Sequence, residues 1–236
     1  MKGRASLPVF LPPGTLPWFP EVDGADADGL VAVGGDLSPE RLLLAYEKGI
    51  FPWFDDDVPP LWWSPDPRAV VPVGHVHVSR RLARRLRQGV FRFTWDTAFR
   101  EVMTACGSER EEGTWIVEQM LAGYLRLHEL GHAHSLEVWI GADLVGGIYG
   151  VQRGALFSAE SMFHRETDAS KAALVACVRS VARHGVTLFD VQMMTSHLES
   201  MGAVTVPRAR YVTDAAAACG VPVDLSDVEP RWELDA

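Results

Sequence analysis

The period of the hydrophobic pattern changes from 3.6 to 2 at His134, and this change limits the folds open to the chain. The runs H-S-L-E-V-W-I and L-V-G-G-I-Y-G flank Gly141-Ala142-Asp143, and A-L-F-S-A-E-S-M-F continues the pattern. A period of two around a short turn predicts an antiparallel hairpin followed by a third strand. The alanine-rich stretch 169–184, closed by Gly185, predicts a helix packed on that sheet. T-L-F-D-V-Q predicts a fourth strand, so the chain mixes helices and strands in one layered fold.

Length and composition place the chain among soluble globular proteins. It has 236 residues, of which 47% are hydrophobic and 22% charged, which suits one large domain or two modest ones. The N-terminus lacks the apolar core of a signal peptide and no apolar run reaches membrane length, so we expect a cytoplasmic protein. Its three cysteines are widely spaced, which argues against a disulfide framework or a C-x-x-C metal site.

The chain up to Pro67 is rich in proline and tryptophan. Ser38 as N-cap, Pro39 as first residue and Gly49 as terminator predict one short helix there. We expect most of the nearby tryptophans to form the core of a small, loop-rich domain, namely Trp18, Trp53, Trp62 and Trp63. The prolines of W-W-S-P-D-P-R suggest a boundary, which gives domains of residues 1–66 and 67–236.

An arginine-rich segment between Ser79 and Gly89 contrasts with the formal net charge of −9. The sequence S-R-R-L-A-R-R-L-R-Q-G predicts a capped helix whose apolar stripe is only Leu82 and Leu86, so the helix must lie on the surface. Such a local basic footprint on an acidic protein is typical of phosphate recognition, although a simply solvated face stays open. The arginines are Arg80, Arg81, Arg84, Arg85 and Arg87.

Three polar residues interrupt the apolar strands. Alternation would put Asp190 and Gln192 on one face of the strand L-F-D-V-Q, and Glu160 ends the strand L-F-S-A-E. Buried polar groups are either hydrogen-bonded structure or chemistry. A carboxylate that caps neighbouring backbone, or a surface glutamate, therefore stays open beside the interpretation as a site.

Several common reaction centres lack their motifs. The histidine pairs His75/His77 and His132/His134 have no third ligand at metal-site spacing. The sequence contains no G-x-S-x-G, no G-x-x-x-x-G-K-[ST] and no G-x-G-x-x-G. These absences favour a transferase that needs no metal, nucleotide or other cofactor.

Blocks across residues 28 to 212 resemble one family. They are G-L-V-A-V-G-G-D-L-S-P-E-R-L-L-L-A-Y-E-K-G-I-F-P-W-F, W-W-S-P-D-P-R, E-R-E-E-G-T-W-I, L-H-E-L-G-H-A-H-S-L-E-V-W, L-V-G-G-I-Y-G, F-S-A-E-S-M-F and A-S-K-A-A-L, and they are similar to the bacterial leucyl/phenylalanyl-tRNA–protein transferases. The resemblance implies an α/β (α+β) fold: a small N-terminal domain and a C-terminal domain like the GCN5-related N-acetyltransferases, with a mixed, largely antiparallel sheet flanked by helices. It implies transfer of Leu or Phe, with Met as a further candidate donor, from aminoacyl-tRNA to the N-terminal Arg or Lys of proteins, which marks them for degradation by the N-end rule pathway.

The resemblance also implies roles for individual residues. Asp190 would hydrogen-bond and polarise Gln192, whose carbonyl oxygen accepts from the attacking amine, and Glu160 would hold the α-ammonium of the donor. Trp53 and Trp115 would stack on the terminal adenosine, and the five arginines would grip the acceptor-stem backbone. The expected partners are Leu-tRNA, Phe-tRNA and acceptor proteins, bound by a monomer. The implied aminoacyl pocket is Ile148, Phe157, Met162, Leu174, Cys177 and Phe189.

Two other functions remain possible at this stage. An acetyl-CoA-dependent N-acetyltransferase on the same fold would need a pyrophosphate loop of the R-x-x-G-x-G/A kind, and E-S-M-F-H-R-E-T-D-A-S lacks the glycines. A non-catalytic tRNA-binding module would explain the arginines and tryptophans but not the Asp-x-Gln.

Overall fold

A computed structural model describes residues 8–108 and 116–233. The first part of the chain forms a four-stranded sheet in the order β1-β2-β4-β3. Strand β1 (Val9–Leu11) pairs in parallel with β2 (Leu30–Gly34), whereas β4 (Leu61–Trp63) is antiparallel to both β2 and β3 (Phe51–Pro52). The short 3-10 helix η1 (Val22–Gly24) precedes β2.

Seven strands form the second and larger sheet, in the order β11-β5-β10-β9-β8-β7-β6. Its centre is the expected hairpin with its third strand: β7 (Ala133–Ile140), β8 (Asp143–Arg153) and β9 (Leu156–His164). Only β9 and β10 (Leu188–Asp190) pair in parallel. The outer strands are β5 (Arg68–Val71), β6 (Arg92–Trp95) and β11 (Val204–Val206). The expected mixed, largely antiparallel sheet is thus confirmed.

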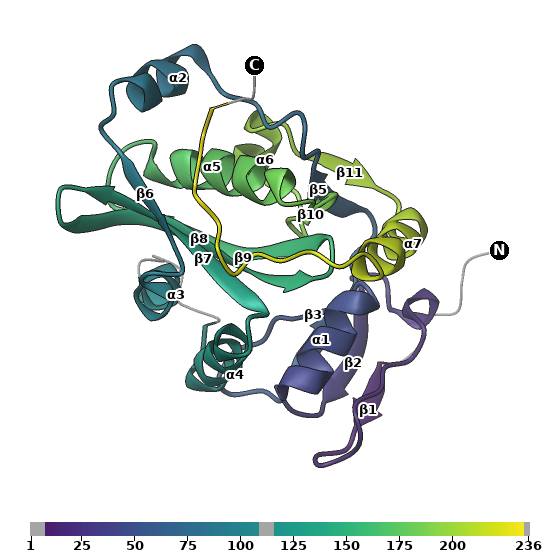
Figure 1. The fold of residues 1–236 in the computed structure, drawn as a ribbon. Helices are drawn as coiled ribbons and strands as arrows, with labels where there is room; N and C mark the ends of the chain where they lie inside the picture. Colours follow the sequence, from purple (N-terminus) through teal and green to yellow (C-terminus); the bar gives the residue numbers. More distant parts are fainter. Residues whose placement is uncertain (1–7, 109–115, 234–236) are drawn as a thin grey trace.

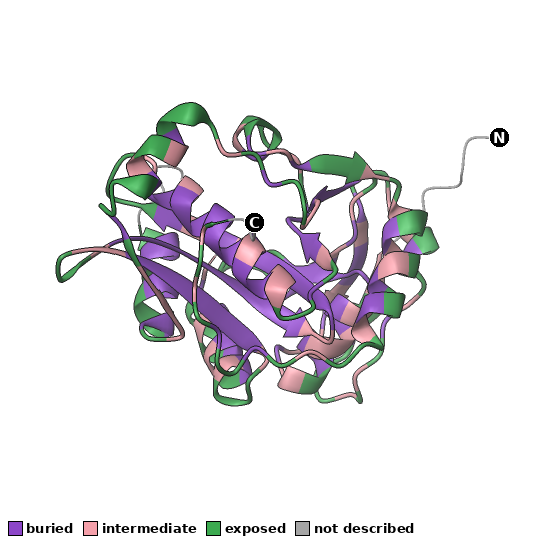
Figure 2. Cartoon of the chain, turned by 45° about the horizontal axis from the view of Figure 1, so that its top comes forward, coloured by how far each residue is buried: buried purple, intermediate pink, exposed green. Residues whose placement is uncertain are grey.

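Helices cover both faces of this sheet (Figure 1). Helix α5 (Ala169–Arg183) crosses one face against β7, β8 and β9, while α3 (Phe99–Ser108) and α4 (Glu118–Glu129) pack on the other. Helix α5 is buried along most of its length, as Figure 2 shows. Its first residue, Ala169, lies so close to the sheet that a Cβ on Gly146 would stand 2.8 Å from the Ala169 Cβ. Glycine in β8 therefore lets the start of α5 reach the sheet.

The N-terminal helix α1 (Pro39–Glu47) forms where expected, after Ser38 and before Gly49 at φ +74°. One apolar cluster unites residues of this part, such as Leu42 and Trp62, with Val102 and Met120 of α3 and α4. The two sheets thus share a core. Of the four tryptophans expected in it, only Trp62 is fully buried, because Trp18 and Trp53 stay at the surface and Trp63 is half-buried.

Two further helices, α2 and α7, lie near the edges of the molecule. Helix α2 (Arg80–Arg87) lies on the surface, capped by the Ser79 hydroxyl and buried only through Leu82 and Leu86, as predicted. After the short helix α6 (Ser196–Ser200), helix α7 (Arg208–Cys219) inserts Tyr211 into the interior. Residues 220–233 then run back across the molecule, where the Leu225 carbonyl accepts a hydrogen bond from Trp95 Nε1.

Candidate active site

A cavity of about 330 Å³ opens where the N-terminal part meets the large sheet. Its wall combines β3 and the following Trp53 with Ile148 of β8, the outer half of β9, and the segment that joins β10 to α6. Glu160 and Gln192 supply polar groups to a lining that is otherwise mostly apolar. A concave apolar site with a few convergent polar groups is the usual form of a small-ligand pocket.

Asp190, at the end of β10, is fully buried and forms a bidentate ion pair with Arg68 at the start of β5. Arg68 Nε donates to Oδ1 at 2.8 Å and Nη2 donates to Oδ2 at 2.7 Å. The guanidinium also donates to the Gly49 carbonyl and lies between the rings of Phe51 and Tyr211. Burial by itself lowers the pKa of Arg68, but the charge and hydrogen bonds of Asp190, together with Tyr211 and Glu160, outweigh burial and raise that pKa. Asp190 is therefore held as a fully paired carboxylate.

Gln192 does not continue the strand, contrary to the alternation expected for Asp190 and Gln192. Strand β10 ends at Asp190, and Gln192 takes a left-handed backbone conformation at φ +54°. The cause is local: Asp190 Oδ1 accepts a hydrogen bond from the Gln192 backbone N–H at 3.0 Å and so turns the chain. Asp190 thus contacts Gln192 through its backbone, whereas the resemblance implied side-chain polarisation.

The side chain of Gln192 is fixed from the other side by Glu160. Gln192 Nε2 donates to Glu160 Oε1 at 3.0 Å, which leaves the Gln192 amide oxygen as the acceptor for a group in the cavity. Glu160 Oε2 accepts from the Tyr124 hydroxyl at 2.9 Å, and that hydroxyl bonds the Tyr46 hydroxyl. Strand β9, helix α4 and helix α1 each contribute one member of this chain, so both parts of the molecule build it.

Glu160 can change protonation state near neutral pH. Burial raises its pKa most strongly; the hydrogen bonds from Tyr124 and Tyr46 oppose the rise, Asp190 adds to it, and the result is a pKa of about 7. Burial and the Glu160 charge raise the pKa of both tyrosines well above their usual value, so they stay neutral donors. Glu160 is consequently an acceptor whose charge responds to a bound cation.

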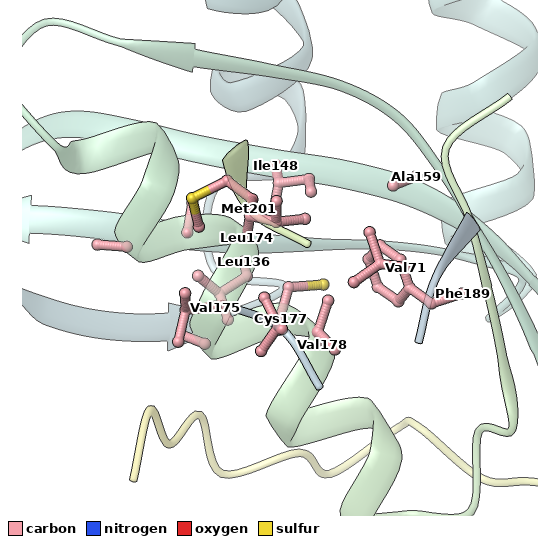
Figure 3. Packing of buried hydrophobic residues seen from close by; sticks show 14 of the residues in the cluster. Val71, Leu136, Ile148, Ala159, Leu174, Val175, Cys177, Val178, Phe189 and Met201 are labelled. Atoms are coloured by element: carbon pink, nitrogen blue, oxygen red, sulfur yellow. The ribbon is translucent and has the colours of Figure 1, made fainter. Parts of the chain in front are cut away.

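The residues expected to form the aminoacyl pocket separate into two groups. Ile148 and Met162 line the cavity. The other four are buried in the core behind the wall, where Figure 3 shows Leu174, Cys177 and Phe189 among the packed side chains: Phe157, Leu174, Cys177 and Phe189. Phe157 stacks on Phe189 with ring centroids 5.3 Å apart. This second group shapes the cavity by supporting it, and burial raises the pKa of the Cys177 thiol, which stays uncharged.

Trp53 stands at the rim of the cavity with 40% of its surface exposed. Its carbonyl accepts a hydrogen bond from Trp63 Nε1, and the two rings lie 5.9 Å apart. An exposed indole braced in this way offers a face to a planar group. Trp115, its expected partner, lies outside the described residues.

The five arginines of α2 are of two kinds. Arg81 and Arg85 approach Asp168, which precedes α5, with N–O distances of 3.4 and 3.9 Å. Arg80, Arg84 and Arg87 are exposed and form no ion pair with any described residue. Three of the five arginines therefore carry positive charge with no ion pair among the described residues, and the other two lie near Asp168 at the start of α5.

Sequence reasoning missed the partners of the three polar residues. Arg68 could have been found, since a cation inside the apolar run R-A-V-V is the same signal as Asp190 in L-F-D-V. Tyr46 and Tyr124 carry no such signal, because a tyrosine on the buried face of a helix is ordinary core. Within residues 8–108 and 116–233, no three His, Cys, Asp or Glu side chains gather as metal ligands, and no helix could cross a membrane.

Comparison with known proteins assigns the chain. A family model described as leucyl/phenylalanyl-tRNA protein transferase matches residues 70–216, and a model of that protein's N-terminal domain matches residues 35–66. A leucyl/phenylalanyl-tRNA–protein transferase of Thiobacillus denitrificans is 53% identical over 223 residues, which are 93% of this chain and 96% of the relative. The chain belongs to this family. The corresponding transferase of Anaeromyxobacter sp. is 50% identical and covers 92% of both chains.

Among solved structures, L-PGS from Bacillus licheniformis is similar to this transferase with a TM-score of 0.41 and 12% identity. The match covers 70% of this chain and 53% of that one. The two transferase relatives, by contrast, match more than nine tenths of this chain. The family found from the sequence is thus confirmed.

Proposed function

We propose that this transferase moves Leu or Phe from aminoacyl-tRNA to the α-amino group of an N-terminal Arg or Lys, and so creates a degradation signal. Family membership makes the chain a leucyl/phenylalanyl-tRNA–protein transferase. The choice of Arg or Lys, and the role of each residue, go beyond it. The acetyl-CoA alternative has no support from the family.

The reaction is the aminolysis of an ester that is already activated. The acceptor nitrogen attacks the ester carbonyl carbon, the new C–N bond forms, the bond to the 3′ oxygen breaks, and a proton passes from the nitrogen to that oxygen. A free α-amine has a pKa of about 7.7 to 8.0, so only a minority is ready to attack at neutral pH. Positioning the neutral amine against the ester carbonyl therefore contributes more to the rate than a strong base would.

The observation that carries the proposal is the orientation of Gln192. Its backbone is turned by Asp190 and its amide nitrogen is held by Glu160, which presents the amide oxygen to the cavity. We assign this oxygen the role of accepting a hydrogen bond from an N–H of the attacking amine. Asp190 and Arg68 are positioning residues, since their charges are paired with each other. This favours orientation over proton abstraction by the Asp190–Gln192 pair.

Glu160 is assigned the α-ammonium of the donor amino acid. A carboxylate whose pKa is about 7 when the cavity is empty would ionise fully beside a cation. Ile148 and Met162 would receive the donor side chain, together with Ala159, Val191 and Leu198 of the same wall. Methionine suits both a branched aliphatic and an aromatic group. Trp53 would stack on the terminal adenosine, and the exposed arginines of α2 would contact the acceptor stem.

We also propose two domains, residues 1–66 and 67–236. Support comes from the division of the two sheets between Trp63 and Arg68. The shared apolar core means that the two would fold together. The cytoplasmic location and the monomeric state stay predictions.

A transfer assay tests the function. Labelled Leu-, Phe- and Met-tRNA are paired with peptides that begin with Arg, Lys or Ala. We expect transfer of Leu and Phe to the Arg and Lys peptides and little to the Ala peptide. Equal labelling of all three peptides would refute the acceptor assignment, and labelling of none would refute the activity.

A further inference from the structure

A second hollow adjoins the catalytic cavity. It has a volume of about 640 Å³ and lies between the end of β9 and the start of α5, lined by the connecting loop 164–168 and the first turn of α5. We call it the loop cavity. Met162 and His197 line both hollows, so the two adjoin. Nothing in the proposed reaction uses it.

The first turn of α5 offers donors to the loop cavity. Ser170 lines it with only 7% of its surface exposed, yet its hydroxyl has no hydrogen-bond partner in the part of the chain that the structure describes. No side chain caps the start of this 15-residue helix. Free backbone N–H groups and the positive end of the helix dipole favour an anion there.

A ring nitrogen of His197 faces the same hollow. Nε2 of His197 is buried and has no hydrogen-bond partner among the residues that the structure describes. Burial lowers the pKa of His197, and the nearby Lys171 and His164 lower it further, which shows that the local field is positive. A neutral imidazole in such a field can donate to an anion without a change of charge.

The charges of the loop cavity leave a positive excess. Lys171 makes no ion pair within residues 8–108 and 116–233, whereas the two acids lie near arginines of α2, although Asp168 Oδ2 accepts no hydrogen bond from the described residues. Asp168 lies near Arg81 and Arg85, and Glu166 lies 3.8 Å from Arg85. A cationic side chain of the acceptor would be repelled by Lys171, so the hollow suits an anion.

The position of the loop cavity says which anion this is. Asp168 at its border lies near the arginines of α2, and His197 lines both it and the catalytic cavity. A strand of nucleic acid that leaves the arginines of α2 and ends in the catalytic cavity must pass it.

We propose that the loop cavity binds a backbone phosphate of the single-stranded 3′ end of aminoacyl-tRNA, next to the terminal adenosine. This rests on the proposed function. Ser170 and the N–H groups of the first turn of α5 donate to the phosphate, Lys171 supplies the charge, and His197 donates from the side of the catalytic cavity. The phosphate fixes the strand so that the ester enters in one register.

Two aminoacyl donors distinguish binding at the loop cavity from binding at the catalytic cavity. Phe-tRNA carries the phosphate, whereas a puromycin-type aminoacyl-adenosine lacks a 5′ phosphate. For Lys171→Met we expect the KM for Phe-tRNA to rise roughly tenfold, the size of one charge-assisted hydrogen bond, with kcat little changed. The slope of log affinity against log salt should fall by about 0.7 for a single-stranded contact. Binding of the aminoacyl-adenosine should not change.

Controls keep the outcome clear. Lys48→Met removes a positive charge from the C-terminal end of α1, away from the loop cavity. It should leave the binding of both Phe-tRNA and the aminoacyl-adenosine unchanged. Lys171→Arg should restore most of the affinity for Phe-tRNA. Ser170→Ala, with a melting temperature like that of the wild type, provides a second variant should Lys171→Met fold poorly. Ser170→Ala should also weaken the binding of Phe-tRNA but not the binding of the aminoacyl-adenosine.

The inference is overturned if Lys171→Met and Ser170→Ala bind Phe-tRNA like the wild type, or if they weaken both donors equally. Either result leaves the proposed function intact, since the wild type would still transfer Phe to an Arg peptide. Loss of the proposed function would instead appear as a wild type that transfers nothing.

Discussion

The end of β10 and helix α2 both concentrate charge, but they do so under opposite conditions. Arg68 and Asp190 are at most 1% exposed, and each hydrogen bond of the pair is matched. Arg80, Arg84 and Arg87 stand in solvent with no ion pair among the described residues. A buried pair fixes geometry and tolerates no loss of one member, whereas exposed cations attract at long range and weaken with salt.

The largest expected effect comes from breaking the buried pair. Asp190→Ala leaves the Arg68 charge uncompensated, so we expect the free energy of unfolding to fall by about 3 to 5 kcal/mol. It also releases the backbone of Gln192, so transfer of Phe to an Arg peptide should fall by roughly 10²-fold or more, with tRNA affinity retained. Urea unfolding, a transfer assay and a tRNA titration measure these changes.

A matched control uses the exposed pair of Arg210 and Asp214 on α7. Asp214→Ala removes the same kind of contact and should cost about 0.5 kcal/mol with normal transfer. The double variant Arg68→Met with Asp190→Leu should regain stability but not activity, because the hydrophobic pair cannot turn Gln192. Full transfer by Asp190→Ala would remove Asp190 from the site.

An intermediate effect on stability is expected from Glu160. It differs from the buried Arg68–Asp190 pair and from the exposed arginines of α2 because its charge can change near neutral pH. Its pKa of about 7 in the folded chain exceeds its ordinary 4.5. The folded state therefore binds the proton more tightly. The resulting stability is fully present below the unfolded pKa and is lost as pH rises through about 7. The shift corresponds to about 3 kcal/mol.

Unfolding at about pH 5 and about pH 8 tests this. The wild type should lose stability toward the higher pH relative to Glu160→Gln, whose profile should be flatter. Glu199→Gln, an exposed change on α6, should keep the wild-type profile. Identical profiles for the wild type and Glu160→Gln would mean that Glu160 is not held in a site that disfavours its charge.

The smallest effect on stability is expected on α2. Arg84→Glu should change the free energy of unfolding by less than about 0.5 kcal/mol, since the side chain is exposed. It should nevertheless weaken tRNA binding roughly tenfold and flatten its salt dependence. A filter-binding titration at several salt concentrations measures both, with Arg100→Glu on α3 as the control. Unchanged affinity would return these arginines to an ordinary solvated surface.

The same contrast explains what could be predicted from the sequence. Helix α2 follows from neighbours alone: the Ser79 cap, the pair Leu82 and Leu86, and the terminating Gly89. Strands β7, β8 and β9 follow from their period and short turns. The three polar residues of the site were found because they interrupt apolar strands.

Their partners could not be predicted in the same way. Arg68 and Asp190 are separated by 122 residues, and Tyr46 and Tyr124 by 78. No local pattern reports what lies opposite a side chain at such separations. The turn at Gln192 was missed for a related reason, since a hydrogen bond from the Gln192 backbone N–H to the Asp190 carboxylate overrides the strand propensity of V-Q. The cavity wall likewise depends on which apolar residues face inward at a strand end.

The environment of Arg68 has a consequence for synthesis of the protein. Its guanidinium is held by the Gly49 carbonyl, by Asp190, and by the ring of Tyr211. These contacts come from three separate places in the chain: the residue Gly49 after α1, the end of β10, and α7. A growing polypeptide that has not yet released α7 from the ribosome leaves one face of this cation uncovered. The environment of this cation is thus complete only once α7 has been made and has packed against it.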